Sequence, residues 1–221
     1  MADGSLLATG MQVEIWSDVV CPWCYLGKRR FEQALAEFEH RDEIQLTYRS
    51  FELDPTAQKG VTTPTVQMLA SKYGMTARQA DQAQRQMEER AAGDGLVFKM
   101  DGLLSGNTRD AHRLLQLAKA RQLQPELMER LHSAYFTEQT SIFDHDALTT
   151  LAVETGLDKD EVATVLASEE YGAEVDAEEA AARDLGVTGV PFYVIDRRYG
   201  ISGAQPAETI TQVLEKAWAE R

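Results

Sequence analysis

The 221-residue sequence predicts an α/β fold in which a long helical segment interrupts a small sheet. Three observations lead to this prediction. Residues 12–17 and 44–51 have the apolar, β-branched or alternating character of strands. From residue 63, apolar residues recur at helical spacing in one segment after another. After residue 186, two short β runs precede a final helix, so strands occur only near the two ends of the chain.

The first part of the chain follows a strand–helix–strand order. Residues 12–17 predict a strand, and residues 22–39 predict an amphipathic helix with Phe31, Leu35 and Phe38 on one face. Residues 44–51 alternate apolar and polar side chains, which is typical of a half-buried strand. The stretch 54–60 contains Pro55 and Gly60 and predicts a loop.

The middle of the chain carries repeated start and stop signals for helices. Thr63 precedes Pro64, and this order predicts an N-cap followed by the first helical residue. Thr76 and Gln79 have the spacing of a capping box. Further boundaries are expected where a capping residue, proline or glycine adjoins a helical pattern: Gly74, Gly93, Gly95, Asn107 or Thr108, Pro125, Asp144 or His145, Gly156 and Asp158.

The last part of the chain returns to mixed structure. Residues 177–185 predict a helix, 191–195 a strand, 199–201 its hairpin partner, and 206–218 a final helix. The complete order, βαβ, helices, αββα, predicts a thioredoxin fold with an inserted all-helical domain. We expect residues 11–60 and 176–221 to form the thioredoxin-like domain and 61–175 the insertion. Residues 1–10 are expected to be a leader without fixed structure.

Both cysteines of the chain lie in one motif, Cys21-Pro22-Trp23-Cys24, at the first strand–helix junction. A helix N-terminus favours a thiolate, because unpaired N–H groups and the helix dipole stabilise negative charge there. A Cys-X-X-Cys pair in this context predicts a redox-active dithiol. We expect Cys21, the more N-terminal and more exposed thiol, to attack the substrate and Cys24 to resolve the mixed disulfide. Pro22 suits the first helical turn, and Trp23 is expected to be exposed beside the cysteines.

Two other interpretations of the cysteine pair are a zinc site and inert buried thiols. Structural zinc needs four ligands, and the chain has no further cysteine and no histidine pair at zinc-binding spacing, so we expect no metal. The interpretation as inert buried thiols does not explain why Pro22-Trp23 lies between the cysteines. Lys28 shares a helix face with the cysteines. It either lowers the pKa of Cys21 or is a solvated cation, and we favour the solvated cation.

A second motif, Thr188-Gly189-Val190-Pro191, opens the strand at 191–195. A proline cannot donate a hydrogen bond within a sheet and therefore belongs at a strand start or edge. In thioredoxin-like folds the proline at this place is cis and faces the cysteine pair, so we expect a cis Val190–Pro191 bond. The backbone of Val190 is then expected to bind an extended substrate segment as an added strand.

Charge and terminal sequence restrict the partners. A net charge of −14 argues against nucleic acid, which requires clustered basic residues. No apolar stretch reaches the ~20 residues that span a membrane. The N-terminal residues lack the basic and apolar regions of a signal peptide. We therefore expect a cytoplasmic protein, in which a cysteine pair is more often catalytic than structural.

With these motifs in view, the chain resembles the DsbA family of thiol oxidoreductases, and within it the FrnE-like branch. The resemblance rests on residues 17–31, 51–55, 107–115, 186–192 and 199–206 and extends over nearly the whole chain. It implies thiol–disulfide oxidoreductase or isomerase activity on disulfide-containing proteins or peptides, without a bound cofactor. Glutathione is a candidate redox co-substrate. Some FrnE-like proteins carry a second cysteine pair near the C-terminus, which this chain lacks.

The same superfamily includes 2-hydroxychromene-2-carboxylate isomerase and kappa-class glutathione transferase. These proteins bind glutathione and carry serine where this chain has Cys21, so a glutathione-dependent isomerase or transferase is the alternative function. Asn107 and His112 belong to the shared pattern and are expected to line the substrate cleft, although His112 is equally consistent with a packed helix residue. A third interpretation is a non-catalytic module that binds peptides through its helical domain.

Overall fold

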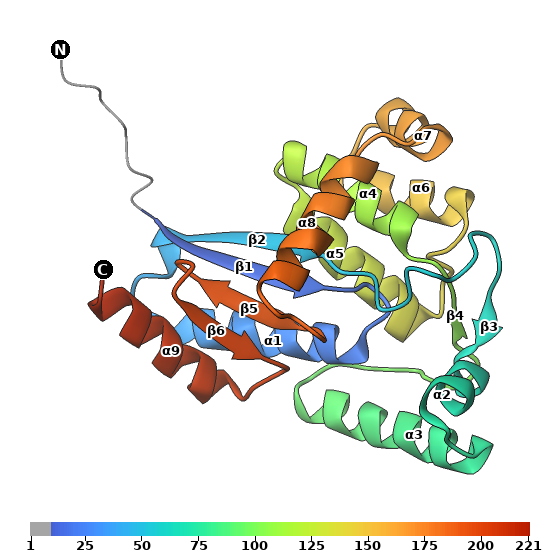
Figure 1. Cartoon of the computed structure of the whole chain (residues 1–221), viewed down its shortest axis with the longest axis horizontal. Helices are drawn as coiled ribbons and strands as arrows, with labels where there is room; N and C mark the ends of the chain where they lie inside the picture. The colour runs from blue at the N-terminus through green and yellow to red at the C-terminus, as the bar shows by residue number, and fades with distance from the viewer. Residues whose placement is uncertain (1–9) are drawn as a thin grey trace.

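A mixed sheet forms the centre of the computed structural model, which describes residues 10–221 (Figure 1). Its strand order is β2-β1-β5-β6. β1 pairs in parallel with β2 and antiparallel with β5, which in turn pairs antiparallel with β6. Apart from Gly10, the predicted leader lies outside the described residues. The strands are β1 (Met11–Ser17), β2 (Ile44–Ser50), β5 (Phe192–Ile195) and β6 (Tyr199–Ser202).

Helices cover both faces of this sheet. Val13 and Ile15 of β1 belong to the main buried cluster, whereas Trp16 packs in a second cluster with residues of α8, because successive side chains of a strand point to opposite faces. α1 and α9 pack against each other, and α8 covers part of the opposite face (Figure 1). The bounds are α1 (Pro22–Glu37), α8 (Gly172–Asp184) and α9 (Ala207–Ala219), with a short turn η1 (Arg41–Glu43) before β2.

The inserted segment is largely helical, as predicted. Its elements are β3 (Thr63–Pro64), α2 (Thr65–Tyr73), α3 (Ala77–Gly93), β4 (Leu104–Ser105), α4 (Arg109–Ala120), α5 (Gln124–Ser133), η2 (Ala134–Glu138), α6 (His145–Glu154) and α7 (Lys159–Ala167). The capping box of Thr76 and Gln79 is confirmed, and so is the N-cap role of Asp158.

The prediction that Thr63 caps the first inserted helix is wrong. Thr63 pairs with Ser105 in the short β3–β4 ladder, which no local sequence pattern predicts. The Thr65 amide donates to the Leu103 carbonyl at 2.9 Å, so this segment is extended until α2 begins at Thr65. A pairing partner about 40 residues away in the chain thus overrides the local capping signal.

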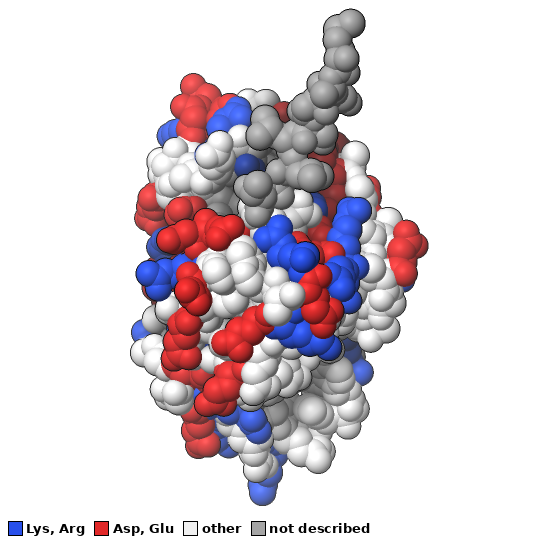
Figure 2. All heavy atoms as spheres, turned by 90° about the vertical axis from the view of Figure 1, so that its left-hand side faces the viewer, with Lys and Arg blue, Asp and Glu red and all other residues white. Residues whose placement is uncertain are grey.

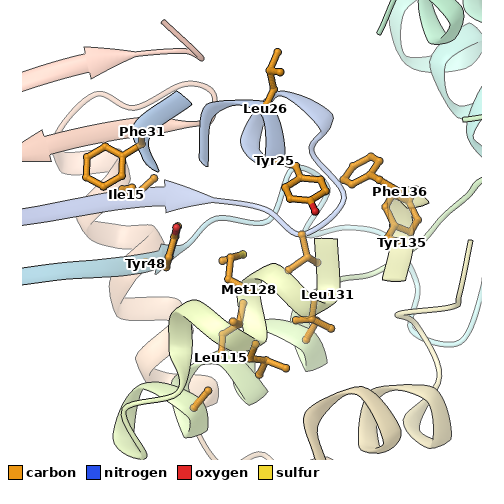
Figure 3. Packing of buried hydrophobic residues seen from close by; sticks show 14 of the residues in the cluster. Ile15, Tyr25, Leu26, Phe31, Tyr48, Leu115, Met128, Leu131, Tyr135 and Phe136 are labelled. Carbon is orange, nitrogen blue, oxygen red and sulfur yellow. The ribbon is translucent and has the colours of Figure 1, made fainter. Parts of the chain in front are cut away.

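The inserted helices pack against the β2 edge of the sheet. The side-chain amide of Gln124, at the start of α5, accepts from the Tyr48 amide and donates to the Tyr48 carbonyl, both at 3.0 Å. This side chain therefore pairs the free edge of β2 much as a neighbouring strand does. Figure 3 shows side chains from the sheet, α1, α4 and α5 within one buried cluster. The division into domains at 60/61 and 175/176 stays a prediction.

Charges of both signs are spread over the surface. On the face shown in Figure 2, acidic side chains extend over most of the height of the molecule, and basic side chains form one group right of the centre and lie scattered elsewhere. None of the helices in residues 10–221 combines the length and apolar character that a membrane span requires.

Candidate active site

The two cysteines lie where β1 gives way to α1. β1 ends at Ser17 and α1 begins at Pro22, so Cys21 is the N-cap residue and has an extended backbone. The Cys21 amide donates to the Asp18 carbonyl at 3.2 Å, and the Cys24 amide donates to the Cys21 carbonyl at 3.0 Å. This turn holds both side chains at the positive end of the helix dipole. Both thiols are free, so the structure describes the reduced dithiol.

Both thiols of the pair are buried. Cys21 was expected to be the more exposed thiol, but the two differ little, because Cys21 is 3% and Cys24 2% exposed. The Cys21 sulfur is covered by the Val190 carbonyl, 3.6 Å away. Burial raises the pKa of Cys24 well above its ordinary value, and the Cys21 sulfur raises it further. The backbone of Asp18 and the hydroxyl of Ser17 oppose this rise without cancelling it. Cys24 is therefore a protonated thiol at neutral pH.

Trp23 lies at the rim of the dithiol. It is 39% exposed, as the sequence predicted, while both cysteines beside it are buried. The guanidinium carbon of Arg90, in the last turn of α3, lies 5.6 Å from the centroid of the Trp23 ring. This distance is within the range of a cation–π contact. No local pattern points to Arg90, because it lies 67 positions from Trp23 and in another helix.

The Val190–Pro191 loop lies beside the cysteines. The predicted cis bond is confirmed. The Cys21 thiol donates to the Val190 carbonyl, and Pro191 approaches α1 so closely that a Cβ atom on Gly27 would lie 2.9 Å from its Cγ. The loop and the cysteine-bearing helix therefore form one packed unit. That Val190 docks an extended substrate stays a prediction.

Lys28 is a buried cation paired with carboxylates, and its influence on Cys21 stays a prediction. It is 5% exposed, so the favoured interpretation as a solvated cation is wrong. Its ammonium group forms ion pairs with Glu32, one turn later on α1, and with Glu129 on α5. Glu129 also accepts a hydrogen bond from the Tyr25 hydroxyl at 2.8 Å. Lys28 thus joins α1 to the inserted helices, and its charge is balanced by carboxylates.

A buried ion pair lies behind the strand–helix junction. Asp18 and His112 are each 1% exposed, and the Asp18 Oδ1 atom is 3.1 Å from His112 Nε2. Asp18 Oδ2 accepts the Leu53 amide at 2.8 Å. Burial lowers the pKa of His112, but the hydrogen bond and charge of Asp18 outweigh it, and the net effect raises that pKa. Asp18 therefore fixes the residues before Cys21 to α4 and to the segment after β2.

His112 was expected either to line the cleft or to be a packed helix residue, whereas Asp18 was not expected to take part. The sequence does contain a signal for a buried role of Asp18, because this charged residue lies within the largely apolar stretch from Ile15 to Val20. A carboxylate in such a run requires a buried partner. The functional role predicted for His112, in contact with substrate, stays a prediction.

Asn107 lies in a different environment. Its amide nitrogen donates to the Ala57 carbonyl and its amide oxygen accepts from the Arg109 backbone, both at 3.0 Å. It thereby fulfils the helix-start role that the sequence assigned to Asn107 or Thr108. It also lines a hollow of about 630 Å³, together with Lys59 from the loop before β3 and residues of α4, α6 and α7. Substrate binding by Asn107 stays a prediction.

No group of three or more histidine, cysteine or acidic side chains within residues 10–221 is arranged to hold a metal ion.

Comparison with known proteins places these features in a family. Residues 12–215 match the DSBA-like thioredoxin domain. A probable DsbA oxidoreductase from Streptomyces coelicolor has a similar structure, with 49% identity, a TM-score of 0.92, and coverage of 96% of this chain and 91% of that one.

Two more distant structures share the fold. The cytosolic disulfide reductase DsbM from Pseudomonas aeruginosa, solved with GSH, is 18% identical, with a TM-score of 0.60 and coverage of 94% and 99%. A 2-hydroxychromene-2-carboxylate isomerase is 20% identical, with a TM-score of 0.64 and coverage of 95% of each chain. Because the family match includes the dithiol, the neighbouring loop and nearly the whole chain, the protein belongs to the DsbA-like thioredoxin family of thiol oxidoreductases.

Proposed function

We propose that the protein exchanges disulfides with protein or peptide substrates through Cys21 and Cys24, as a thiol–disulfide oxidoreductase or isomerase. The observation that carries this proposal is the asymmetry of the dithiol. Cys21 is the N-cap residue of α1 and contacts the Val190 carbonyl, whereas burial keeps Cys24 protonated one turn further along.

Thiol–disulfide exchange on this dithiol proceeds in two steps. The Cys21 thiolate attacks one sulfur of the substrate disulfide, forming a mixed disulfide and releasing the other substrate sulfur as a thiolate. Cys24 then loses its proton and attacks the Cys21 sulfur. A Cys21–Cys24 disulfide forms, and the second substrate thiolate leaves and takes up a proton. The two electrons of the dithiol pass to the substrate, and the reverse sequence oxidises a substrate dithiol.

The direction of exchange follows from the redox potential. A DsbA-like potential of about −120 mV in a cytosol poised near −240 mV would keep the dithiol reduced by about four orders of magnitude. We propose a cytoplasmic location and action on existing disulfides, as a reductase or isomerase, with glutathione as the reductant that regenerates the dithiol. Titration of the Cys21–Cys24 pair against a glutathione buffer measures this potential directly.

The alternative, a glutathione-dependent isomerase or transferase, has the shared fold in its favour. The residue at position 21 separates the two functions, because a thiol can form a mixed disulfide and a serine hydroxyl cannot. We expect the wild type to reduce insulin disulfides and Cys21→Ser to lose this activity. Glutathione conjugation that survives Cys21→Ser would instead support the alternative. If the wild type has neither activity, the proposal is wrong and a peptide-binding module becomes the better interpretation.

A further inference from the structure

The position of Arg90 beside the dithiol has a consequence for substrate choice. Its guanidinium group lies over Trp23, the exposed residue between the two buried cysteines. Arg30 fixes the end of α3 in this place, because its guanidinium group makes two hydrogen bonds to the Asp94 carboxylate, at 3.0 and 2.9 Å. Figure 1 shows this end of α3 below α1. Arg90 is thus a cation held at the rim of the site.

Other basic residues near the start of α1 are already neutralised. Lys28 and Arg29 pair with Glu32 and Glu129, and Arg30 pairs with Asp94. Arg90 is exposed and, within the residues that the structure describes, makes no ion pair with a carboxylate. Its N–H groups donate no hydrogen bond to another residue in that part of the chain, so they are available to a ligand.

We propose that Arg90 is a specificity-determining residue that favours disulfides whose cysteine is flanked by acidic residues. This inference rests on the proposed function. Trp23 is the exposed residue between the two buried cysteines, so a substrate whose sulfur meets Cys21 comes to lie beside it, and a carboxylate near that sulfur can take two hydrogen bonds from Arg90. The net charge of −14 opposes acidic substrates only weakly at a distance, because salt screens exposed charges beyond about 8–10 Å.

The test uses three disulfide-linked peptides with identical lengths, in which the residues flanking each cysteine are Glu, Ser or Lys. The ratio of kcat/KM for the Glu peptide to that for the Ser peptide is measured in the wild type, Arg90→Gln and Arg78→Gln. Arg78 is a matched control because it is also exposed on α3, about 18 Å away along the helix axis. We expect the ratio to fall about three- to five-fold in Arg90→Gln and to stay at the wild-type value in Arg78→Gln.

Two further measurements separate recognition from other effects. Arg90→Lys keeps the charge but not the planar pair of donors, so its ratio should lie between those of wild type and Arg90→Gln. The wild-type preference should also shrink at about 1 M salt.

An unchanged ratio in Arg90→Gln, including an equal slowing of all three peptides, would overturn the role of Arg90 while leaving the proposed function in place. An equal loss of the ratio in Arg78→Gln would overturn it as well, because the effect would then be one of net charge. Failure of the wild type to reduce any of the peptides would contradict the proposed function itself, and the inference with it.

Discussion

Gly27→Ala tests the packing that holds the dithiol helix against the Pro191 loop. Gly27 lies on the buried face of α1, and a Cβ atom there would be 2.5 Å from the Tyr193 hydroxyl and 2.9 Å from Pro191 Cγ. Ordinary contacts begin at 3.4 Å, so the neighbours would have to retreat by about 0.9 and 0.5 Å. The Tyr193 side chain is fully buried and the Pro191 ring is tied to the backbone, so neither can swing away. α1 and β5 must therefore separate.

The expected change in the stability of Gly27→Ala is the balance of two opposing effects. Overpacking a filled core costs about 1–3 kcal/mol, and the change from glycine to alanine within a helix returns up to about 1 kcal/mol. We expect Gly27→Ala to lower the free energy of unfolding by about 1–2 kcal/mol. The same separation moves Pro191 away from Cys21. A misplacement of about 1 Å can cost 100-fold in rate, so the smaller shift here predicts a loss on the order of ten-fold in disulfide reduction.

Urea unfolding and peptide-disulfide reduction measure both effects. Gly93→Ala is the matched control, because Gly93 also lies in a helix and no atom comes within 4 Å of its added Cβ. It should leave stability unchanged or raise it by up to about 1 kcal/mol. A Gly27→Ala protein as stable and as active as the wild type would refute the reasoning about this contact.

Three further perturbations test the electrostatics of the site. Limiting iodoacetamide at neutral pH should label Cys21 before Cys24, because burial raises the pKa of the Cys24 thiol; peptide mapping that finds Cys24 labelled first would reverse their roles. The raised pKa of His112 means that its pair with Asp18 stabilises the fold fully below about pH 6.5 and loses this contribution as the pH rises through the raised value. The difference in unfolding free energy between wild type and Asp18→Asn should therefore narrow as the pH rises above about 6.5, and a constant or widening difference would contradict the ion pair. Burial would raise the pKa of Asp110, but hydrogen bonds from three basic side chains lower it to about 2. Asp110→Asn should thus cost about 1–2 kcal/mol at pH 7, after allowance for solvent screening, and the cost should vanish as the pH falls from about 4 to 2; a cost that persists at pH 2 would show a different cause.

The order of elements was predictable because it depends on local patterns. The strand at 12–17, the helix after Cys21 and the Thr76–Gln79 capping box each depend on residues within a few positions of one another, and the structure contains all three. The short β3–β4 ladder was not predictable, because its two strands are separated by about 40 residues and contain only two residues each.

The site was predictable where a motif is continuous. The cysteine pair and the Val190–Pro191 bond each lie within four residues of sequence, and the fold that brings them together was expected from the order of elements. The burial of Cys21 was not predictable, because the carbonyl that covers it comes from position 190. The Trp23–Arg90 contact depends on how two helices pack, and no local pattern encodes that packing.

The docking of the inserted helices shows the same limit. The Gln124 side chain pairs with the backbone of Tyr48, and Lys28 pairs with Glu129. As single polar residues in helical segments, each is equally consistent with a solvated side chain. Only the three-dimensional arrangement shows that Gln124 closes the sheet edge and that Lys28 joins α1 to α5.

The central claim is that Cys21 attacks the substrate and Cys24 resolves the mixed disulfide, and trapping of that intermediate tests it most directly. Each single variant, Cys24→Ser and Cys21→Ser, is reduced, mixed with a disulfide-linked peptide, quenched with acid and weighed intact by mass spectrometry. Cys24→Ser should accumulate one peptide in disulfide linkage to Cys21, because the resolving thiol is absent, whereas Cys21→Ser should remain unmodified and the wild type should pass to the internal disulfide. A peptide adduct on Cys24 in Cys21→Ser, or no adduct in Cys24→Ser, would contradict the assignment.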